Sequence, residues 1–318
     1  MPTSKRAVGP IGGVVIVTVT PNLALDITYT VDQLVIGTPM RVPDARQRAG
    51  GKGVNVARVL HQLGVDVQAI AMCGGNNGRT VAAEFASAGL AHRLVAIAGE
   101  TRRAIAVVDR STGEATVFNE VGPAVTAPEW AELEAAVAAA LAEAEVLVVS
   151  GSLPPGAPAD GHARIVKASH RAGVPVVVDA TGQALLSAAK AGPDVVKPNK
   201  SELLEATGAA DVTSGARVLL DSGARAVVVS LGADGAEAFS ESGTWTARPA
   251  HPVQGNATGA GDAMVAALAL GLARGWDWQQ RLCEAVALSA AAVAHPQAGS
   301  FDEDTYLLSR RSAIGIGP

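Results

Sequence analysis

The stretch that decides the fold lies in the middle of the chain and reads VLVVSGSLPPGAPADGHARIVKASHRAGVPVVVD from Val146 to Asp179. Two β-branched runs, Val146–Ser150 and Val174–Asp179, flank a helical segment at Gly161–Ala172. Short, uninterrupted apolar strands are typical of parallel sheets, because helices cover both faces of such sheets. The stretch therefore predicts a strand–helix–strand unit of a parallel sheet.

The same alternation continues on both sides of this unit. Further strands are predicted at Val14–Thr20, Val67–Met72, Asp194–Lys197 and Ala226–Leu231. Further helices are predicted at Gly53–Leu63, Thr80–Ala88, Pro128–Ala144, Ser201–Thr207, Ser214–Ser222, Gly261–Arg274 and Gln279–Ala294. Strands that alternate with helices in this way indicate the α/β class, with a mainly parallel sheet between two layers of helices.

Two segments break the alternation. Leu25–Ala45 and Thr101–Phe118 contain short strands with no helix between them. They predict either a small second sheet that stands off the main one, or edge hairpins of the main sheet. Residues 1–10 are interpreted as a loose tail and residues 11–318 as one domain. Lys5 and Arg6 ahead of an apolar run also resemble a signal peptide, but the β-branched character of the run favours a buried strand.

Composition restricts the classes of partner. The 318 residues are 48% hydrophobic and 17% charged, with a formal net charge of −5. Such a chain lacks the basic excess of nucleic-acid-binding proteins, so we expect no nucleic-acid partner. No apolar stretch approaches the length of a membrane span, and Cys73 and Cys283 do not form a metal-ligand spacing. We therefore expect a cytoplasmic protein that acts on a small molecule.

The strongest local signal is the segment NATGAGD, residues 256–262, directly before an apolar helix. Glycines at a helix start let backbone N–H groups converge on an anion, and the helix dipole adds positive potential there. The segment can therefore hold a phosphate group, with Asp262 beside it. The alternative is structural, because an acidic residue in the first turn stabilises any helix. No Gly-Lys-Ser/Thr closes the turn, so it is not a P-loop.

A second glycine cluster, AGGKGVNVA at residues 49–57, also opens a helix. Its small residues, Gly50 and Gly51, allow a ligand to approach the backbone closely. Lys52 adds a cation, and Asn55 offers both donors and acceptors to hydroxyl groups. A tight strand-to-helix turn without a ligand would also explain these glycines.

A third cluster, KPNKSE at residues 197–202, follows a predicted strand. It falls at the carboxyl edge of the sheet, where open α/β sheets bind ligands. Asn199 and Glu202 are three residues apart, so at a helix start they could face one site and hold hydrated magnesium. Equally, Asn199 or Ser201 could cap the helix while Glu202 stabilises its dipole.

Two more clusters end predicted strands. The segment SLGADGA, residues 230–236, could support a nucleotide or form a hairpin turn, and SGSLPPG, residues 150–156, could present a hydroxyl. Asp26, Arg41 and Arg102 fall in or beside the spare-strand regions, where they could grip a polyhydroxylated anion or remain surface charges. Since five clusters fall at the carboxyl ends of predicted strands, they indicate one shared site.

These motifs resemble the PfkB (ribokinase-like) carbohydrate kinases over nearly the whole chain, from about Val14 to about Leu307. The resemblance rests on residues 50–57 and 258–262, and on the NxxE motif of residues 199–202. The 1-phosphofructokinase and tagatose-6-phosphate kinase branch is the most similar, through the segments TVTPNLALD (18–26), GETR (99–102) and SGSLP (150–154).

The resemblance implies a three-layer α/β/α sandwich with a small β-sheet lid, through which relatives often dimerise. It also implies ATP and Mg²⁺ as cofactors. Asp262 would be the general base, beside an anion hole formed by Gly259, Ala260 and Gly261. The residues implied to bind substrate are Asp26, Arg41, Gly50, Gly51, Lys52, Asn55, Arg102 and Ser152. The residues implied to line the ATP site are Lys197, Asn199, Ser230, Gly232, Gly235, Asn256 and Thr258, with Asn199 and Glu202 near magnesium through water.

The resemblance also narrows the substrate. Relatives that phosphorylate fructose 6-phosphate often have glycine where this chain has Lys52, so the expected substrate is fructose 1-phosphate or tagatose 6-phosphate. Leu23 replaces the proline that is usual in this branch and lies near the sugar. A 6-phosphofructokinase, or a kinase of unphosphorylated sugars or nucleosides, is the alternative. A dinucleotide-dependent oxidoreductase would need Gly-x-Gly-x-x-Gly after the first strand, and Pro21 and Asn22 stand there instead.

Overall fold

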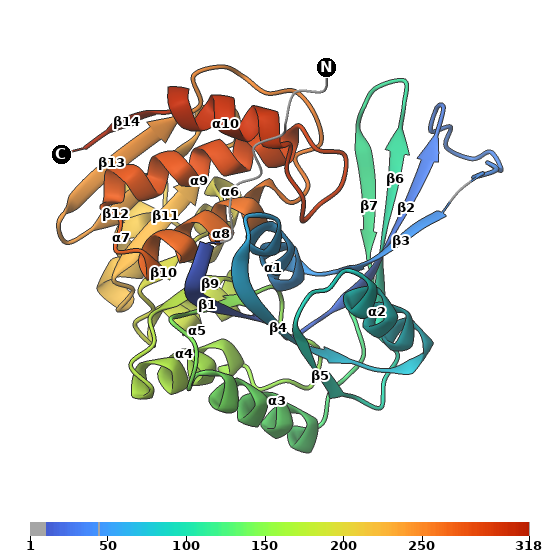
Figure 1. Cartoon of the computed structure of the whole chain (residues 1–318), viewed down its shortest axis with the longest axis horizontal. Helices are drawn as coiled ribbons and strands as arrows, with labels where there is room; N and C mark the ends of the chain where they lie inside the picture. The colour runs from blue at the N-terminus through green and yellow to red at the C-terminus, as the bar shows by residue number, and fades with distance from the viewer. Residues whose placement is uncertain (1–10, 44, 318) are drawn as a thin grey trace.

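The computed structural model describes residues 11–43 and 45–317. Its main body is a ten-stranded sheet with helices on both faces, and a separate four-stranded sheet projects from one side (Figure 1). The predicted tail, residues 1–10, lies outside the described residues. The expected α/β class, the mainly parallel sheet and the small second sheet are confirmed, whereas the edge-hairpin alternative is wrong.

The main sheet has the strand order β14-β13-β12-β11-β10-β9-β8-β1-β4-β5. In chain order the strands are β1 (Ile11–Thr20), β4 (Val65–Cys73), β5 (His92–Ala96), β8 (Val146–Ser150), β9 (Val176–Asp179), β10 (Val195–Val196), β11 (Ala226–Ser230), β12 (Ala236–Ser240), β13 (Gly243–Arg248) and β14 (Ile314–Ile316). The strands from β5 to β11 pair in parallel, and β12 to β14 add an antiparallel edge. The carboxyl ends of the parallel strands therefore share one edge of the sheet.

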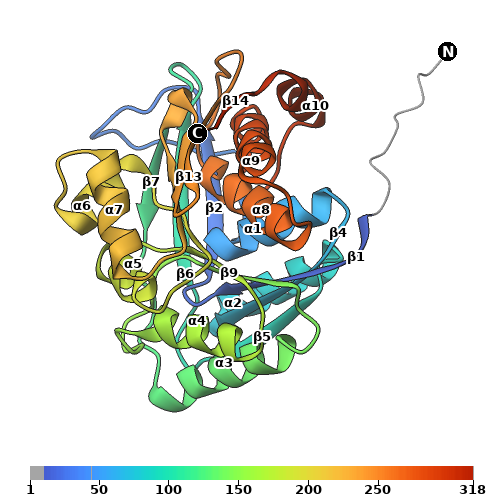
Figure 2. The ribbon, with the colours of Figure 1, turned by 90° about the vertical axis from the view of Figure 1, so that its left-hand side faces the viewer.

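Two helical layers bury the sheet, as the turned view shows (Figure 2). One apolar core joins the sheet to α1 (Lys52–Gln62), α8 (Ala260–Ala273) and α9 (Trp278–Val293), with α2 (Gly75–Ser87) and α10 (Glu303–Ser312) beside them. The other core joins it to α3 (Ala127–Ala140), α4 (Gly161–Arg171), α5 (Gly182–Ala189), α6 (Lys200–Thr207) and α7 (Val212–Ser222). No helix in the described ranges is long and apolar enough to cross a membrane.

The small sheet has the order β3-β2-β6-β7 and is called the lid below. Its strands are β2 (Ala24–Val31), β3 (Ala45–Gly50), β6 (Arg102–Asp109) and β7 (Ala115–Asn119). On β6, Ala104, Ala106 and Val108 face the cleft described below, because side chains alternate between the two faces of a strand. The lid thus covers the carboxyl edge of the main sheet (Figure 1).

Candidate active site

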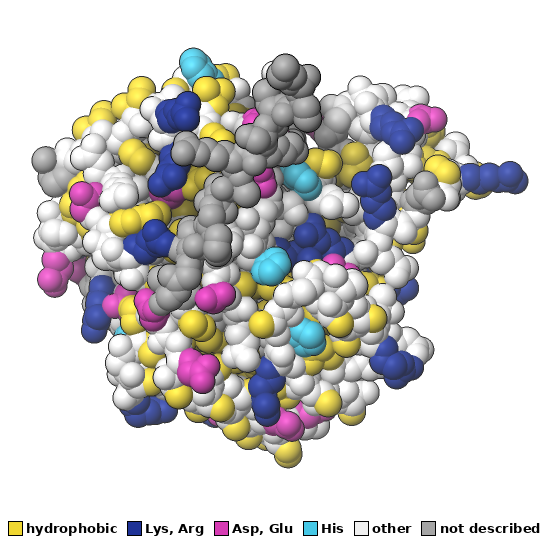
Figure 3. All heavy atoms as spheres, in the orientation of Figure 1, with side chains coloured by type: hydrophobic (Ala, Val, Ile, Leu, Met, Phe, Trp, Pro, Cys, Tyr) yellow, Lys and Arg dark blue, Asp and Glu magenta, His cyan; other side chains and the backbone are white. Residues whose placement is uncertain are grey.

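A cleft of about 1730 Å³ lies between the lid and the carboxyl edge of the main sheet. Lys and Arg side chains gather in the recess between these two parts (Figure 3). The cleft brings most of the predicted site residues together, although they come from segments far apart in the sequence. The predicted residues that line it are Asp26, Gly51, Lys52, Asn55, Arg102, Ser152, Lys197, Asn199, Glu202, Ser230, Gly232, Gly235, Asn256, Thr258, Gly259, Ala260, Gly261 and Asp262.

The N-terminus of α8 opens into this cleft without a side-chain cap. Gly259 is the N-cap residue, with φ of 90°, and an added Cβ would come within 2.9 Å of Ala298. Both constraints require glycine at this position. Within the described residues, the amides of Gly261 and Asp262 have no hydrogen-bond partner, whereas the Ala260 amide donates to the Ala257 carbonyl at 3.2 Å. Free amides at a helix N-terminus can bind an anion.

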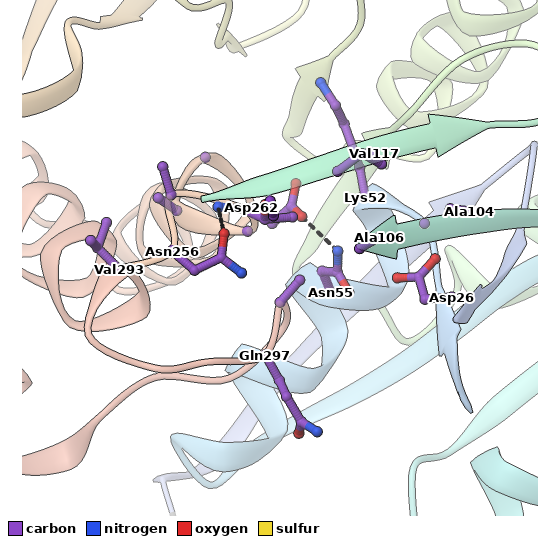
Figure 4. Close-up of a pocket in the computed structure, with 18 of the residues that line it drawn as sticks. Asp26, Lys52, Asn55, Ala104, Ala106, Val117, Asn256, Asp262, Val293 and Gln297 are labelled. Carbon is purple, nitrogen blue, oxygen red and sulfur yellow. Dashed lines mark hydrogen bonds between the residues drawn. The ribbon is translucent and has the colours of Figure 1, made fainter. Parts of the chain in front are cut away.

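Asp262 lies in the first turn of α8 and is 6% exposed. Asn55, on α1, donates a hydrogen bond from Nδ2 to Oδ2 of Asp262 at 2.8 Å, so the two side chains point toward each other (Figure 4). Burial, together with the charge of Asp179, raises the pKa of Asp262 to about 7, against the opposing effects of Lys52, Asn55 and Lys197. A carboxyl group with a pKa near neutrality can take up and release a proton under physiological conditions.

Lys52 lies between two carboxylates, one at the end of β9 and one in the first turn of α6. Its Nζ is 3.2 Å from Oδ1 of Asp179 and 3.5 Å from Oε1 of Glu202. Burial alone would lower the pKa of Lys52, but Asp179, Glu202 and Asp262 together raise it above its ordinary value. The ammonium group therefore stays charged and adds positive potential beside Asp262.

Asp179, at the end of β9, is a site residue that the sequence reasoning did not single out. It is 1% exposed, accepts a hydrogen bond from Ser150 at 3.2 Å and lies 4.0 Å from Lys197. Burial opposes its ionisation, but Lys197 and Lys52 lower its pKa below the ordinary value. The signal that could have found it is its position as an acidic residue at the carboxyl end of a buried parallel strand.

Asn199 and Glu202 form a complete capping box at the start of α6. Oδ1 of Asn199 accepts from the Glu202 amide at 2.8 Å, and Oε2 of Glu202 accepts from the Asn199 amide at 2.9 Å. The structural alternative for this motif is therefore present. Oε1 of Glu202 still faces the cleft beside Lys52, so the pair fits a magnesium ion that is held through water and substrate phosphates. Within the described ranges, no three acidic, His or Cys residues cluster as metal ligands.

The region around Asp26 is rich in arginine. Burial raises the pKa of Asp26 to about 6, although Arg102, Arg48 and Arg58 oppose that shift. Gly50 does not line the cleft but makes room for Asp26, because a Cβ at position 50 would overlap its carboxylate at 2.0 Å. Asp26 is thereby held at the cleft wall, where it can accept hydrogen bonds from hydroxyl groups.

The structure does not bring Arg41 to the cleft. Arg41 is exposed in the loop between β2 and β3, and Arg48, which the sequence reasoning did not name, lines the cleft instead. Arg48 donates to the Ala298 carbonyl at 3.0 Å, and burial lowers its pKa to about 10. The sequence distinguishes these two arginines poorly, because both lie in the same polar segment before the glycine cluster.

The part of the cleft beside the end of β11 combines glycines with an apolar wall. Ser230 ends β11, and Gly232 begins a short 3₁₀ turn that leads into the antiparallel strand β12, so the hairpin interpretation of this segment also holds. An added Cβ at Gly232 would meet no atom within 4 Å, so its backbone is open. Val286 and Val293 line the same cleft. Bare backbone beside apolar side chains fits an adenine base.

Asn256 fixes the turn that precedes α8. Its Oδ1 accepts a hydrogen bond from the Thr258 amide at 3.0 Å, and its Nδ2 donates to the Pro296 carbonyl at 3.4 Å. The side chain therefore holds two loops together at the entrance to the glycine turn. Asn256 acts on the shape of this turn, while the open amides follow it in the chain.

A buried acid at an open helix N-terminus, with lysines and arginines in one cleft of an α/β sheet, fits a phosphotransferase of the sugar-kinase type. Residues 19–305 match the family model described as "pfkB family carbohydrate kinase". The chain belongs to this family, and the resemblance that its motifs predicted is confirmed.

Several relatives resemble the chain over most of its length. The ATP-dependent 6-phosphofructokinase isozyme 2 of Mycobacterium tuberculosis is 35% identical over 297 residues, covering 91% of this chain and 87% of the relative. The 1-phosphofructokinase of Escherichia coli is 32% identical over 292 residues, covering 90% and 93%. A crystal structure of phosphofructokinase-2 from Escherichia coli with potassium has a TM-score of 0.88 at 30% identity, covering 94% of this chain and 99% of that one.

Proposed function

We propose that this enzyme transfers the γ-phosphoryl group of ATP to a hydroxyl group of a sugar phosphate, which yields a sugar bisphosphate and ADP. The observation that carries the proposal is the common cleft. It places Asp262 and the open α8 N-terminus in one cavity with Arg102 and Ser152, which suit a second phosphate. A kinase of unphosphorylated sugars would need no such group of cationic and hydroxyl side chains.

In the proposed step, Asp262 takes the proton of the attacking hydroxyl as its oxygen forms a bond to the γ-phosphorus. The bond between that phosphorus and the bridging oxygen breaks, and ADP leaves with the electron pair. Negative charge on the transferred group is stabilised by the open amides of α8 and by Lys52. Magnesium, held near Asn199 and Glu202, would neutralise phosphate charge when bound.

We propose fructose 1-phosphate or tagatose 6-phosphate as the substrate, and fructose 6-phosphate as the second candidate. Lys52, in a cluster where relatives specific for fructose 6-phosphate often have glycine, favours the first pair. The second candidate is favoured by the 35% identity to a protein named 6-phosphofructokinase isozyme 2. All three sugars carry one phosphate and several hydroxyl groups. The hydroxyl groups suit Asp26 and Asn55, and the phosphate suits the cationic region beside them.

An ADP-release assay tests this proposal. It compares fructose 1-phosphate, tagatose 6-phosphate and fructose 6-phosphate with free fructose, tagatose and ribose, with and without magnesium. We expect rapid turnover of one phosphorylated sugar and turnover of the free sugars that is lower by orders of magnitude. Equal turnover of phosphorylated and free sugars would contradict the second phosphate site. Turnover of none of them would contradict the proposed substrate class.

The lid offers a surface for a second copy of the chain. Phe118, on β7, is 60% exposed and faces away from the cleft, because its neighbours Val117 and Asn119 line the cleft. Aromatic side chains are enriched in the cores of protein interfaces, so Phe118 suits the centre of one. We propose a homodimer through the lid, and one relative, phosphofructokinase-2 from Escherichia coli, has been solved in a tetrameric form. Light scattering of Phe118→Asp should then give a monomer, whereas an unchanged mass would contradict this interface.

A further inference from the structure

Asn22 lies where several segments that join the lid to the main body meet. It follows β1 and precedes β2, so it stands at the first crossing from the main sheet into the lid. Its Nδ2 donates to the Val121 carbonyl at 3.0 Å, just beyond β7, where the chain returns from the lid. Arg102, at the start of β6, donates from Nε to the Asn22 carbonyl at 3.1 Å. Three segments that connect the lid to the main body, before β2, before β6 and after β7, therefore contact one residue.

The same carboxamide also reaches the main body. Nδ2 of Asn22 donates a second hydrogen bond to Oγ of Ser152 at 3.1 Å, in the loop after β8. Because Oγ accepts from Asn22, the hydroxyl proton of Ser152 is not used in that bond. It remains available to an acceptor in the cleft, which Ser152 lines. Asn22 thus orients the hydroxyl of Ser152 so that the hydroxyl can donate a hydrogen bond into the cleft, as the binding of an anion requires.

The side-chain oxygen of Asn22, Oδ1, does not contribute a stabilising hydrogen bond. Asn22 is 6% exposed, and its Oδ1 is buried without a hydrogen-bond partner among the described residues. A buried acceptor without a partner is unfavourable, and an apolar side chain of similar size would avoid it. The geometry therefore indicates that the amide nitrogen, and not the packing of the side chain, is what this position provides.

We propose that Asn22 is a positioning residue for the phosphate already present on the substrate. Its side chain orients Ser152, and its main-chain carbonyl orients the guanidinium of Arg102. It holds both groups relative to the lid crossings, so that a phosphate meets a hydroxyl donor and a cation in a fixed arrangement. This inference rests on the proposed function, because it concerns the sugar phosphate that would occupy the same cleft.

The test uses Asn22→Ala and the isosteric Asn22→Asp, with the sugar phosphate that the wild-type enzyme turns over fastest. In Asn22→Asp, the carboxylate accepts from Ser152, which turns the hydroxyl proton away from the cleft and adds a charge that repels phosphate. We expect the KM for the sugar phosphate to rise about tenfold in Asn22→Ala and more in Asn22→Asp. The KM for ATP and the kcat should stay within about twofold of wild type.

Asn77→Ala is the matched control. Asn77 is half-buried and, like Asn22, donates from Nδ2 to a carbonyl near the lid, that of Thr101, at 2.7 Å, but it does not line the cleft. The Asn77→Ala variant should leave the KM for the sugar phosphate and the KM for ATP unchanged. Asn22→Ala combined with Ser152→Ala should be no worse than Ser152→Ala alone, because the two residues act as one unit.

Three results would overturn the role of Asn22: an unchanged KM for the sugar phosphate in Asn22→Asp, equal increases in both KM values, or effects of Asn22→Ala and Ser152→Ala that multiply. These results all presuppose a wild-type enzyme that turns over a sugar phosphate. Absence of that turnover would instead contradict the proposed function, so the two failures are distinguishable.

Discussion

Helices α6 and α8 begin at the same edge of the sheet with the same arrangement, an acidic residue three positions after the N-cap. In α6 the side chains of Asn199 and Glu202 close a capping box on their own backbone. In α8 the N-cap is Gly259, no side chain caps the helix, and Asp262 is bonded instead by Asn55 from α1. One N-terminus is satisfied internally, whereas the other keeps free amides for a ligand.

This difference favours a different one of the two sequence interpretations at each helix. Glycine at the N-cap makes a helix less stable than a capping side chain does, by roughly a few tenths of a kcal/mol. A protein keeps such an end where a ligand supplies the missing partners. We therefore propose that the acidic residue of α8 takes part in the chemistry, and that the acidic residue of α6 has a structural role with a role near magnesium in addition. The predictions below test this division.

The largest expected effect is that of Asp262→Asn. The amide keeps an oxygen that can accept from Asn55, so the fold should persist, but it cannot take up the hydroxyl proton. We expect kcat to fall about 10²–10⁴-fold, which is the range for loss of a general base, with ATP affinity nearly unchanged. Steady-state kinetics and calorimetric titration with ATP measure these two quantities.

The matched control for this prediction is Asp304→Asn. Asp304 is also an acidic residue in the first turn of a helix, α10, but it is exposed and lies outside the cleft. Its replacement should leave kcat unchanged. If Asp262→Asn retained more than a tenth of the wild-type kcat, its assignment as base would be wrong.

The next effect concerns pH. Asp262 must be ionised to act as base, and its pKa is raised to about 7, so kcat/KM should rise as the pH increases through about 7. Asp179→Asn removes a negative charge that raises this pKa, while Lys52 and Lys197, which lower it, remain. The rising part of the profile should therefore move to lower pH in the variant.

The measurement compares the pH dependence of kcat/KM of the wild type and Asp179→Asn on the same substrate. Titration of the substrate phosphate affects both profiles equally, so it does not contribute to the difference between them. Glu134→Gln, a change outside the cleft, is the control and should not move the profile. A profile that moved to higher pH in Asp179→Asn would show that the lysines, once released from Asp179, no longer act on Asp262.

Much of this site could be predicted from local sequence, for a physical reason. The clusters at residues 50–55, 197–202, 230–235 and 256–262 each follow or begin a regular element, and parallel strands bring such ends to one edge. The β-branched runs identified the inner strands for the same reason, since both their faces are buried. Less apolar elements were missed. For example, α10 carries mainly polar residues and shows itself chiefly by Asp302, whose side chain caps it.

Pairings between distant segments could not be predicted. Lys52 and Asp179 are 127 residues apart, and Asn22 and Ser152 are 130 apart, so no local pattern relates them. Which of Arg41 and Arg48 reaches the cleft depends on where the loop ends and β3 begins. The residues around this boundary are all polar, so the sequence pattern does not reveal it. What the sequence lacked was therefore the contact between clusters, and the raised pKa of Asp262 depends on its burial and on the nearby charge of Asp179, which follow from those contacts.

The smallest effect separates the two roles of α6. Asn199→Ala removes the cap, which should lower the free energy of unfolding by about 0.5–2 kcal/mol. It should also raise the magnesium concentration needed for half-maximal activity, if Asn199 binds water of the hydrated ion. Asn199→Ser restores a capping oxygen but is too short to reach that water. Stability should therefore recover in Asn199→Ser while the magnesium requirement stays raised. Thermal unfolding and magnesium titrations measure these two quantities. If Asn199→Ser recovered both the stability and the wild-type magnesium requirement, Asn199 would act only as a helix cap, and Glu202 alone would provide the magnesium role of this helix.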